Sequence, residues 1–186
     1  MTSSDDLFVF YDTETTGLDI NFSQIIQIGS VLTDSNFKIL DELNLNSQVL
    51  PWVVPSPDAF LVHKQTACLE NGLSHYEMMR TLREKWLSWG KEKNLIFVSY
   101  NGHRFDEELV RRQFYWNLFD PYITNTNGNR RLDLMSLFQI IGNFFDSKIK
   151  VPKDDEENIS LKLTDLAKEN NISVENAHDA IVDCIC

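Results

Sequence analysis

Apolar residues occur along the chain in short runs whose lengths and spacing predict strands first and helices later. Residues 7–11 form an apolar, aromatic run that predicts a strand buried on both faces. Two more strands are predicted over residues 24–32 and 37–45, and the polar residues 34–36 between them are typical of a hairpin turn. The three prolines at positions 51, 55 and 57 predict a loop before the first helix.

The middle and the end of the chain alternate one further strand with helices. Ser74 and Glu77 match a capping box, so a helix is predicted from Ser74 to Gly90. A strand over 95–100 follows, and the later helices are expected over 105–116, 133–145 and 161–169, with a last helix that begins near Asn176. With no internal repeat and no linker, the pattern predicts one α/β domain with a mixed sheet flanked by helices.

Composition narrows the class of protein. No apolar run reaches the ~20 residues that a membrane helix needs, and the N-terminus is polar and acidic rather than basic and apolar, so neither a membrane nor export is expected. Cys68, Cys184 and Cys186 do not form a disulfide framework, which favours the cytoplasm. The net charge of −11 argues against nucleic acid as a partner. Bound divalent cations, however, would reverse the local sign of an acidic site.

Two carboxylates stand at the end of the first predicted strand. Asp12 and Glu14 are two residues apart, so on a strand they point to the same face. Like charges held so close are costly unless a divalent cation neutralises them, and hard cations prefer oxygen ligands. The alternative is a pair of turn or capping carboxylates, which the turn sequence Thr15-Thr16-Gly17 supports. The pair alone leaves both interpretations open.

Three more residues complete a candidate site. Asp106 lies between the strand over 95–100 and a helix, where a carboxylate is ordinarily a helix-capping residue. His178 and Asp183 lie on the last helix and can border one pocket, whereas Asp179 fits a structural role in the first turn. Together with Asp12 and Glu14, these are the parts that two-metal phosphodiester hydrolysis needs, which are carboxylates to hold cations and a base for water.

The order and spacing of these five residues resemble the DEDDh exonucleases, a branch of the ribonuclease-H-like fold. Within that superfamily, the chain is most similar to the N-terminal exonuclease domain of bacterial exodeoxyribonuclease I. The segments that carry this similarity are Tyr100-Asn101, Arg104-Phe105-Asp106-Glu107-Glu108, Phe119-Asp120-Pro121-Tyr122 and Asn176-Ala177-His178-Asp179-Ala180. The resemblance implies that two Mg²⁺ or Mn²⁺ ions are bound by Asp12, Glu14, Asp106 and Asp183, with His178 as general base. It also implies 3′→5′ degradation of single-stranded DNA to mononucleotides.

The resemblance further implies substrate contacts and partners. Candidate substrate-binding residues are Thr13, Thr15, Gly17, Leu18, His63, Asn101 and Arg104. For His63 the alternative is an ordinary loop histidine, and for Leu18 it is core packing. The expected partners are single-stranded DNA and, in the full-length enzyme, the single-stranded-DNA-binding protein. The chain itself is expected to be a monomer.

Two other functions stay open. One is a nuclease of the same fold that acts on RNA or proofreads for a polymerase. The other is a catalytically dead module that binds nucleic acid or protein. Full-length exodeoxyribonuclease I carries further domains, and this chain ends three residues after Asp183. Residues 1–186 are therefore expected to form a single exonuclease domain, truncated at its C-terminus relative to that enzyme.

Overall fold

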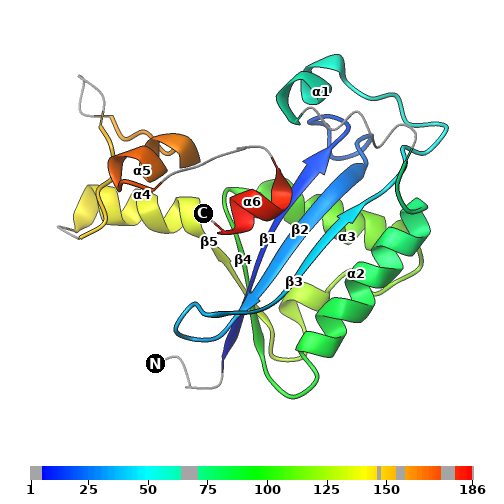
Figure 1. The fold of residues 1–186 in the computed structure, drawn as a ribbon, viewed down its shortest axis with the longest axis horizontal. Helices are drawn as coiled ribbons and strands as arrows, with labels where there is room; N and C mark the ends of the chain where they lie inside the picture. Colours follow the sequence, from blue (N-terminus) through cyan, green and yellow to red (C-terminus); the bar gives the residue numbers. More distant parts are fainter. Residues whose placement is uncertain (1–5, 64–70, 146–147, 154–157, 173–178, 186) are drawn as a thin grey trace.

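A mixed sheet lies at the centre of the computed structural model, which describes residues 6–63, 71–145, 148–153, 158–172 and 179–185 (Figure 1). Its five strands, in the order β3-β2-β1-β4-β5, are β1 (Leu7–Thr15), β2 (Ile25–Thr33), β3 (Ile39–Asn46), β4 (Leu95–Ser99) and β5 (Arg130–Asp133). The first three strands pair antiparallel, and β4 and β5 extend the sheet in parallel with β1. The mixed sheet predicted from the sequence is therefore confirmed.

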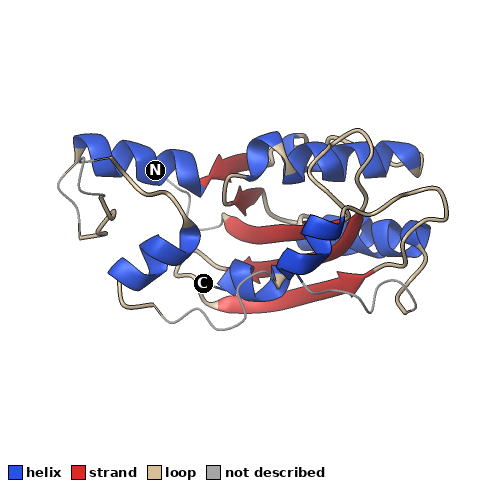
Figure 2. Ribbon diagram, turned by 90° about the horizontal axis from the view of Figure 1, so that it is seen from above, coloured by secondary structure: helices blue, strands red, loops and turns tan. Residues whose placement is uncertain are grey.

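Helices cover the two faces of the sheet unequally (Figures 1 and 2). The described helices are α1 (Pro57–His63), α2 (His75–Trp89), α3 (Asp106–Trp116), α4 (Leu134–Phe144), α5 (Leu163–Glu169) and α6 (Ala180–Ile185), with 3₁₀ turns η2 (Gly102–Arg104) and η3 (Ile123–Asn125). The long helices α2 and α3 share the main hydrophobic core with β1, β2 and β4. The short helix α6 packs on the opposite face, against β1 and β2. No described helix combines the length and the apolar character needed to cross a membrane.

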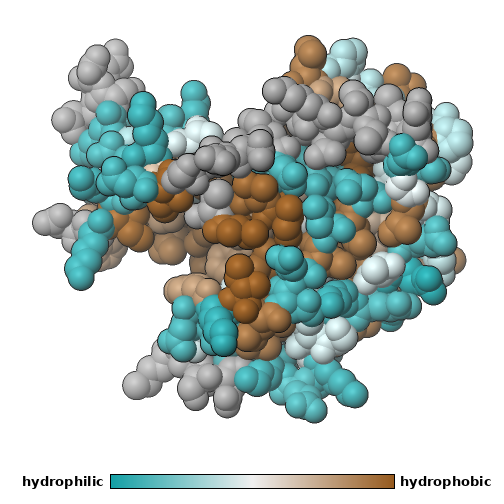
Figure 3. Space-filling view, in the orientation of Figure 1, coloured by the Kyte–Doolittle hydropathy of each residue, from teal (hydrophilic) through white to brown (hydrophobic). Residues whose placement is uncertain are grey.

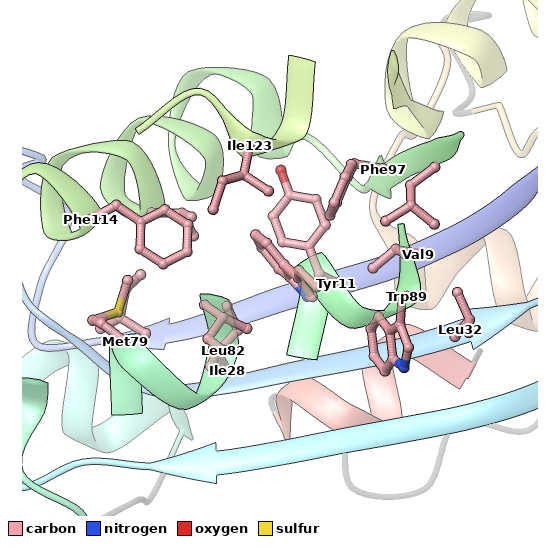
Figure 4. Packing of buried hydrophobic residues seen from close by; sticks show 14 of the residues in the cluster. Val9, Tyr11, Ile28, Leu32, Met79, Leu82, Trp89, Phe97, Phe114 and Ile123 are labelled. Carbon is pink, nitrogen blue, oxygen red and sulfur yellow. The ribbon is translucent and has the colours of Figure 1, made fainter. Parts of the chain in front are cut away.

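The core forms around alternate residues of β1. Val9 and Tyr11 point to the α2 side, where the Tyr11 ring packs edge-on against Trp86 and Phe97 (Figure 4). The intervening residues Phe8 and Phe10 are only half-buried, so the predicted burial of this strand on both faces is wrong. On their face of the sheet, β1 packs against the short helix α6 instead of a long helix, and Phe8 and Phe10 line a groove.

This groove is a mainly apolar hollow of about 660 Å³ between the sheet, α4, α5 and α6. Apolar side chains gather along the middle of this face of the molecule (Figure 3). Phe10, Phe37, Phe138 and Ile185 are among the residues that line it, and Asp183 reaches it from α6.

Most predicted elements lie within a few residues of the observed ones. The hairpin turn is closed by Asp34, whose Oδ1 accepts hydrogen bonds from the backbone N–H groups of Asn36 (2.9 Å) and Lys38 (3.0 Å). Strand β5 was not predicted, because its four residues Arg-Arg-Leu-Asp have no apolar pattern and are strand only through pairing with β4. Asn176, the predicted cap of the last helix, lies outside the described residues.

The capping box of α2 gives a direct test of the local prediction. Ser74 Oγ accepts from Glu77 N (3.2 Å), and Glu77 Oε2 accepts from Ser74 N (3.2 Å). We expect Ser74→Ala to lower the free energy of unfolding by about 0.5–2 kcal/mol, because a helix N–H loses its partner. Urea unfolding would measure this loss. Ser88→Ala, at an exposed position of the same helix, should change it by less than about 0.5 kcal/mol, and equal effects of the two substitutions would contradict the assignment.

Candidate active site

Three carboxylates from two distant segments converge at the end of β1. Asp12 and Glu14 lie on the same face of that strand, as their spacing predicted, and Asp183 reaches them from α6. One carboxylate oxygen from each residue lies within 4.8 Å of the other two, and all three side chains are half-buried. Oxygen atoms gathered this closely are the donor set that a hard divalent cation takes.

Asp106 lies on the α3 side of the same cleft. It is the first residue of α3 and is only 7% exposed. The Thr13 hydroxyl, on the strand between Asp12 and Glu14, donates a hydrogen bond to Asp106 Oδ1. Asp106 is thus tied to β1 next to the three gathered carboxylates, although it lies outside their closest group.

Burial raises the pKa values of these carboxyl groups, and the neighbouring carboxylates raise those of Asp12 and Glu14 further. Burial, followed by the charges of Asp106, Glu14 and Asp183, raises the pKa of Asp12 well above its ordinary value. Burial and the charge of Asp183 raise the pKa of Glu14 to about 8. Burial raises the pKa of Asp106 to about 6. A bound divalent cation would remove this penalty, so the chemistry of the donor set fits a metal.

A buried hydrogen-bond network around Glu107 supports the site from the core side. Glu107 is fully buried and accepts hydrogen bonds from the hydroxyls of Tyr11 (2.8 Å) and Thr124 (2.6 Å) and from Arg131 Nη1 (3.1 Å). Tyr11 directly precedes Asp12, and Glu107 directly follows Asp106. The Tyr11–Glu107 hydrogen bond therefore joins the segments that carry Asp12 and Asp106 a second time. In the sequence, Glu107 stands out only as part of the segment Arg104-Phe105-Asp106-Glu107-Glu108. Its spacing from the buried Val110 and Phe114 would have placed it on the core face of α3.

The carboxylates open into a cleft of about 940 Å³. Its opposite wall is formed by Tyr100, Met135 and the segment 158–163. The Tyr100 hydroxyl donates to the carbonyl oxygen of Leu161 and so holds this wall to the end of β4. Lys162 is the single cationic side chain among the described lining residues.

The candidate substrate residues are distributed in and around this cleft. Thr13 and Asn101 line it, although the Thr13 hydroxyl is already bonded to Asp106. Thr15 is buried and donates to the Gly17 carbonyl oxygen (2.8 Å), which shapes the turn after β1.

The other candidates lie at the rim or outside the description. Leu18 is 88% exposed, so the alternative of core packing is wrong for it. Arg104 is exposed at the end of η2. His63 ends α1, but its side chain is outside the description, and His178 lies outside the described residues altogether. Asp179 keeps the predicted structural role, because its Oδ1 accepts from Ile181 N (3.3 Å) and from Gln27 Nε2 (3.0 Å).

Comparisons with known proteins show which family this chain resembles. Residues 9–186 match the family model described as Exonuclease. The chain is 33% identical over 181 residues to exodeoxyribonuclease I of Buchnera aphidicola subsp. Schizaphis graminum, covering 95% of this chain and 36% of that protein.

Two solved structures of Escherichia coli exonuclease I resemble the model over nearly its whole length. The complex with a dT13 oligonucleotide superposes with a TM-score of 0.87 at 26% identity, over 96% of this chain and 39% of that one. The zinc-ion-bound form of its complex with single-stranded DNA gives 0.86 at 25% identity, over 97% and 38%. The chain thus spans between a third and two fifths of the length of these relatives.

The raised pKa values predict how the metal-free protein responds to pH. Unfolded Glu14 loses its proton near its ordinary pKa of 4.5, whereas folded Glu14 keeps it up to about 8. Between these values the folded state binds more protons, so the free energy of unfolding should fall as pH rises. Urea unfolding in EDTA at pH 5, 6, 7 and 8 would show this fall. Glu14→Gln should make the fall shallower, and an unchanged slope would contradict the raised pKa of Glu14.

Proposed function

This chain belongs to the exonuclease family, and from that premise we propose that it is a metal-dependent 3′→5′ exonuclease that hydrolyses single-stranded DNA to mononucleotides. The observation that carries the proposal is the convergence of Asp12, Glu14 and Asp183 within 4.8 Å of one another, in a cleft that Asp106 also lines. The substrate class is supported by the DNA-bound exonuclease I structures that the model resembles.

Asp12, Glu14, Asp106 and Asp183 are proposed to hold two Mg²⁺ or Mn²⁺ ions. When bound, such ions activate water and stabilise the charge that develops on a phosphate during hydrolysis. The carboxylates of β1 and α6 supply the gathered oxygens, while Asp106 is fixed by the Thr13 hydroxyl on the other side of the cleft. Bound cations would reverse the local sign of the negative charge that these carboxylates carry, and this would allow an acidic protein to act on a polyanion.

His178 is proposed as the general base that takes a proton from the attacking water. Histidine is the side chain whose ordinary pKa lies closest to neutral pH, which suits a general base that works at that pH. His178 precedes the described part of the α6 segment, which carries Asp183 into the site.

The wall of the cleft is proposed to bind the DNA strand. Lys162 offers a positive charge to a phosphate, and Asn101 offers an exposed amide beside the carboxylates. Leu18, at the turn after β1, exposes its side chain. We propose that it contacts the end of the DNA strand, together with the candidate contacts Thr15, Gly17, His63 and Arg104. Action as a monomer in the cytoplasm and binding of the single-stranded-DNA-binding protein by the full-length enzyme remain predictions of the same proposal.

Replacement of Asp12 by Asn tests the metal site. We expect Asp12→Asn to abolish hydrolysis, because one anionic ligand is lost and metal positioning is worth several kcal/mol in the transition state. EDTA should have the same effect on the unmodified chain. The assay uses end-labelled single-stranded DNA, the matching duplex and an RNA of the same sequence, with Mg²⁺ or Mn²⁺.

Glu42→Gln is the matched control, because it also neutralises a carboxylate of the sheet, at an exposed position of β3. This variant should keep its activity. Robust hydrolysis in EDTA or by Asp12→Asn would refute the metal-dependent mechanism. Faster cleavage of RNA than of DNA would instead assign the site to an RNA-directed exonuclease, and no cleavage of any substrate would favour a binding module.

Replacement of His178 by Ala tests the general base separately from metal binding. We expect kcat to fall by about 10²–10⁴-fold, which is the usual contribution of a positioned base. Calorimetry with Mn²⁺ should show nearly unchanged affinity, because the carboxylates remain. If His178→Ala instead removed Mn²⁺ binding, His178 would be a ligand and another group would have to serve as the base.

A further inference from the structure

Two residues of β2 that contact α6, Gln27 and Gly29, lie directly opposite the two carboxylates of β1. In the antiparallel register of these strands, Asp12 pairs with Gly29 and Glu14 pairs with Gln27. Cross-strand partners point to the same face of a sheet. Gly29 and Gln27 therefore face α6, the helix that carries Asp183. Figure 1 shows this short helix lying over the sheet.

Gly29 allows the backbone of α6 to approach the sheet closely. A Cβ at position 29 would lie 2.5 Å from the carbonyl carbon and oxygen of Ala180 and 2.6 Å from Ile181 N. These are backbone atoms, so no rotation of a side chain could relieve the overlap. Any larger residue at position 29 would have to displace α6 from the sheet.

Gln27 holds the start of the same helix through its amide. The side chain is 2% exposed, and its Nε2 donates to Asp179 Oδ1 (3.0 Å) and to Asn44 Oδ1 (3.1 Å). Its Oε1 accepts from the N–H of Ala180 (3.5 Å). A buried amide with partners on both sides has little freedom to turn, so it fixes where α6 begins.

The carboxylates cannot supply this docking themselves. Asp183 approaches Asp12 and Glu14, so whenever these groups are ionised and no cation is bound, their like charges push α6 away from the sheet. The described part of α6 has only six residues, too few to fold as a helix without packing. Contacts other than those of the carboxylates must therefore hold α6 on β2.

We propose that Gln27 and Gly29 are positioning residues of the metal site. They fix the position of α6 on β2 and thereby the distance of Asp183 from Asp12 and Glu14. The inference rests on the proposed metal-dependent function and adds the residues that assemble its ligand set. It also implies a reciprocal coupling, in which a bound cation strengthens the docking of α6 as much as docking strengthens cation binding.

Calorimetric titration with Mn²⁺ tests the first half of the proposal. We expect Gly29→Ala to weaken Mn²⁺ binding by about 10–100-fold, the usual effect of losing a group that orients ligands. Gly90→Ala is the matched control. Gly90 follows α2 with a negative φ of −86°, and an added Cβ there would first meet the end of the Leu95 side chain, at 3.2 Å, and no backbone atom within 3.5 Å. This control should keep the affinity of the unmodified chain.

Gln27→Met keeps the length of the side chain but removes the amide, so it tests the same docking without steric overlap. It should also weaken Mn²⁺ binding, while circular dichroism and cooperative urea unfolding report an intact fold. A second measurement follows α6 itself through Cys184, whose Sγ lies 3.5 Å from the Gly29 carbonyl oxygen. With Cys68→Ser and Cys186→Ser as background, thiol labelling of Cys184 in EDTA should be faster in both variants, and Mn²⁺ should slow labelling of the parent.

The outcomes separate this inference from the function on which it rests. If the unmodified chain binds no Mn²⁺, the proposed metal-dependent function fails, and the positioning role fails with it. If the unmodified chain binds Mn²⁺ and folded Gly29→Ala and Gln27→Met bind it equally well, only the positioning role is overturned. Global unfolding of both variants would also overturn it, because these residues would then maintain the whole sheet.

Discussion

Electrostatic repulsion among the gathered carboxylates is the constraint on which the rest of the structure depends. Asp12, Glu14 and Asp183 place oxygens within 4.8 Å of one another, and Asp106 is close enough for its charge to raise the pKa values of Asp12 and Glu14. Such an arrangement lowers the stability of the metal-free fold. It persists only because the surrounding segments are held in place by interactions that do not involve these charges.

Two sets of contacts, one on each side of β1, provide that support. On the core side, Tyr11 packs among aromatic rings and donates to the buried Glu107, while Thr13 donates to Asp106. On the other side, Gln27 and Gly29 receive α6. Strand β1, which carries Asp12 and Glu14, is thus fixed both to α3, which carries Asp106, and, through β2, to α6, which carries Asp183.

The unequal covering of the sheet also has a chemical consequence. The α2 and α3 layer excludes water from the residues that anchor the site, whereas a cleft of about 940 Å³ stays open beside the carboxylates. A substrate needs access to the carboxylates, and the carboxylates need rigid support. The alternation of β1 meets both needs, because its odd-numbered residues are buried and Asp12 and Glu14 are half-buried.

The sequence by itself determined most of the local structure and supplied the candidate site residues. The capping box at Ser74 and the turn at Asp34 form from neighbouring residues, so their patterns predicted them well. The spacing of Asp12 and Glu14 fixed their common face for the same reason. Only the tertiary structure showed that Asp183 reaches them, because Asp183 is 169 residues away from Glu14 along the chain (183 − 14). Strand β5, the burial of Glu107 and the close contact at Gly29 likewise depend on partners distant in sequence, and no local pattern encodes where those partners lie.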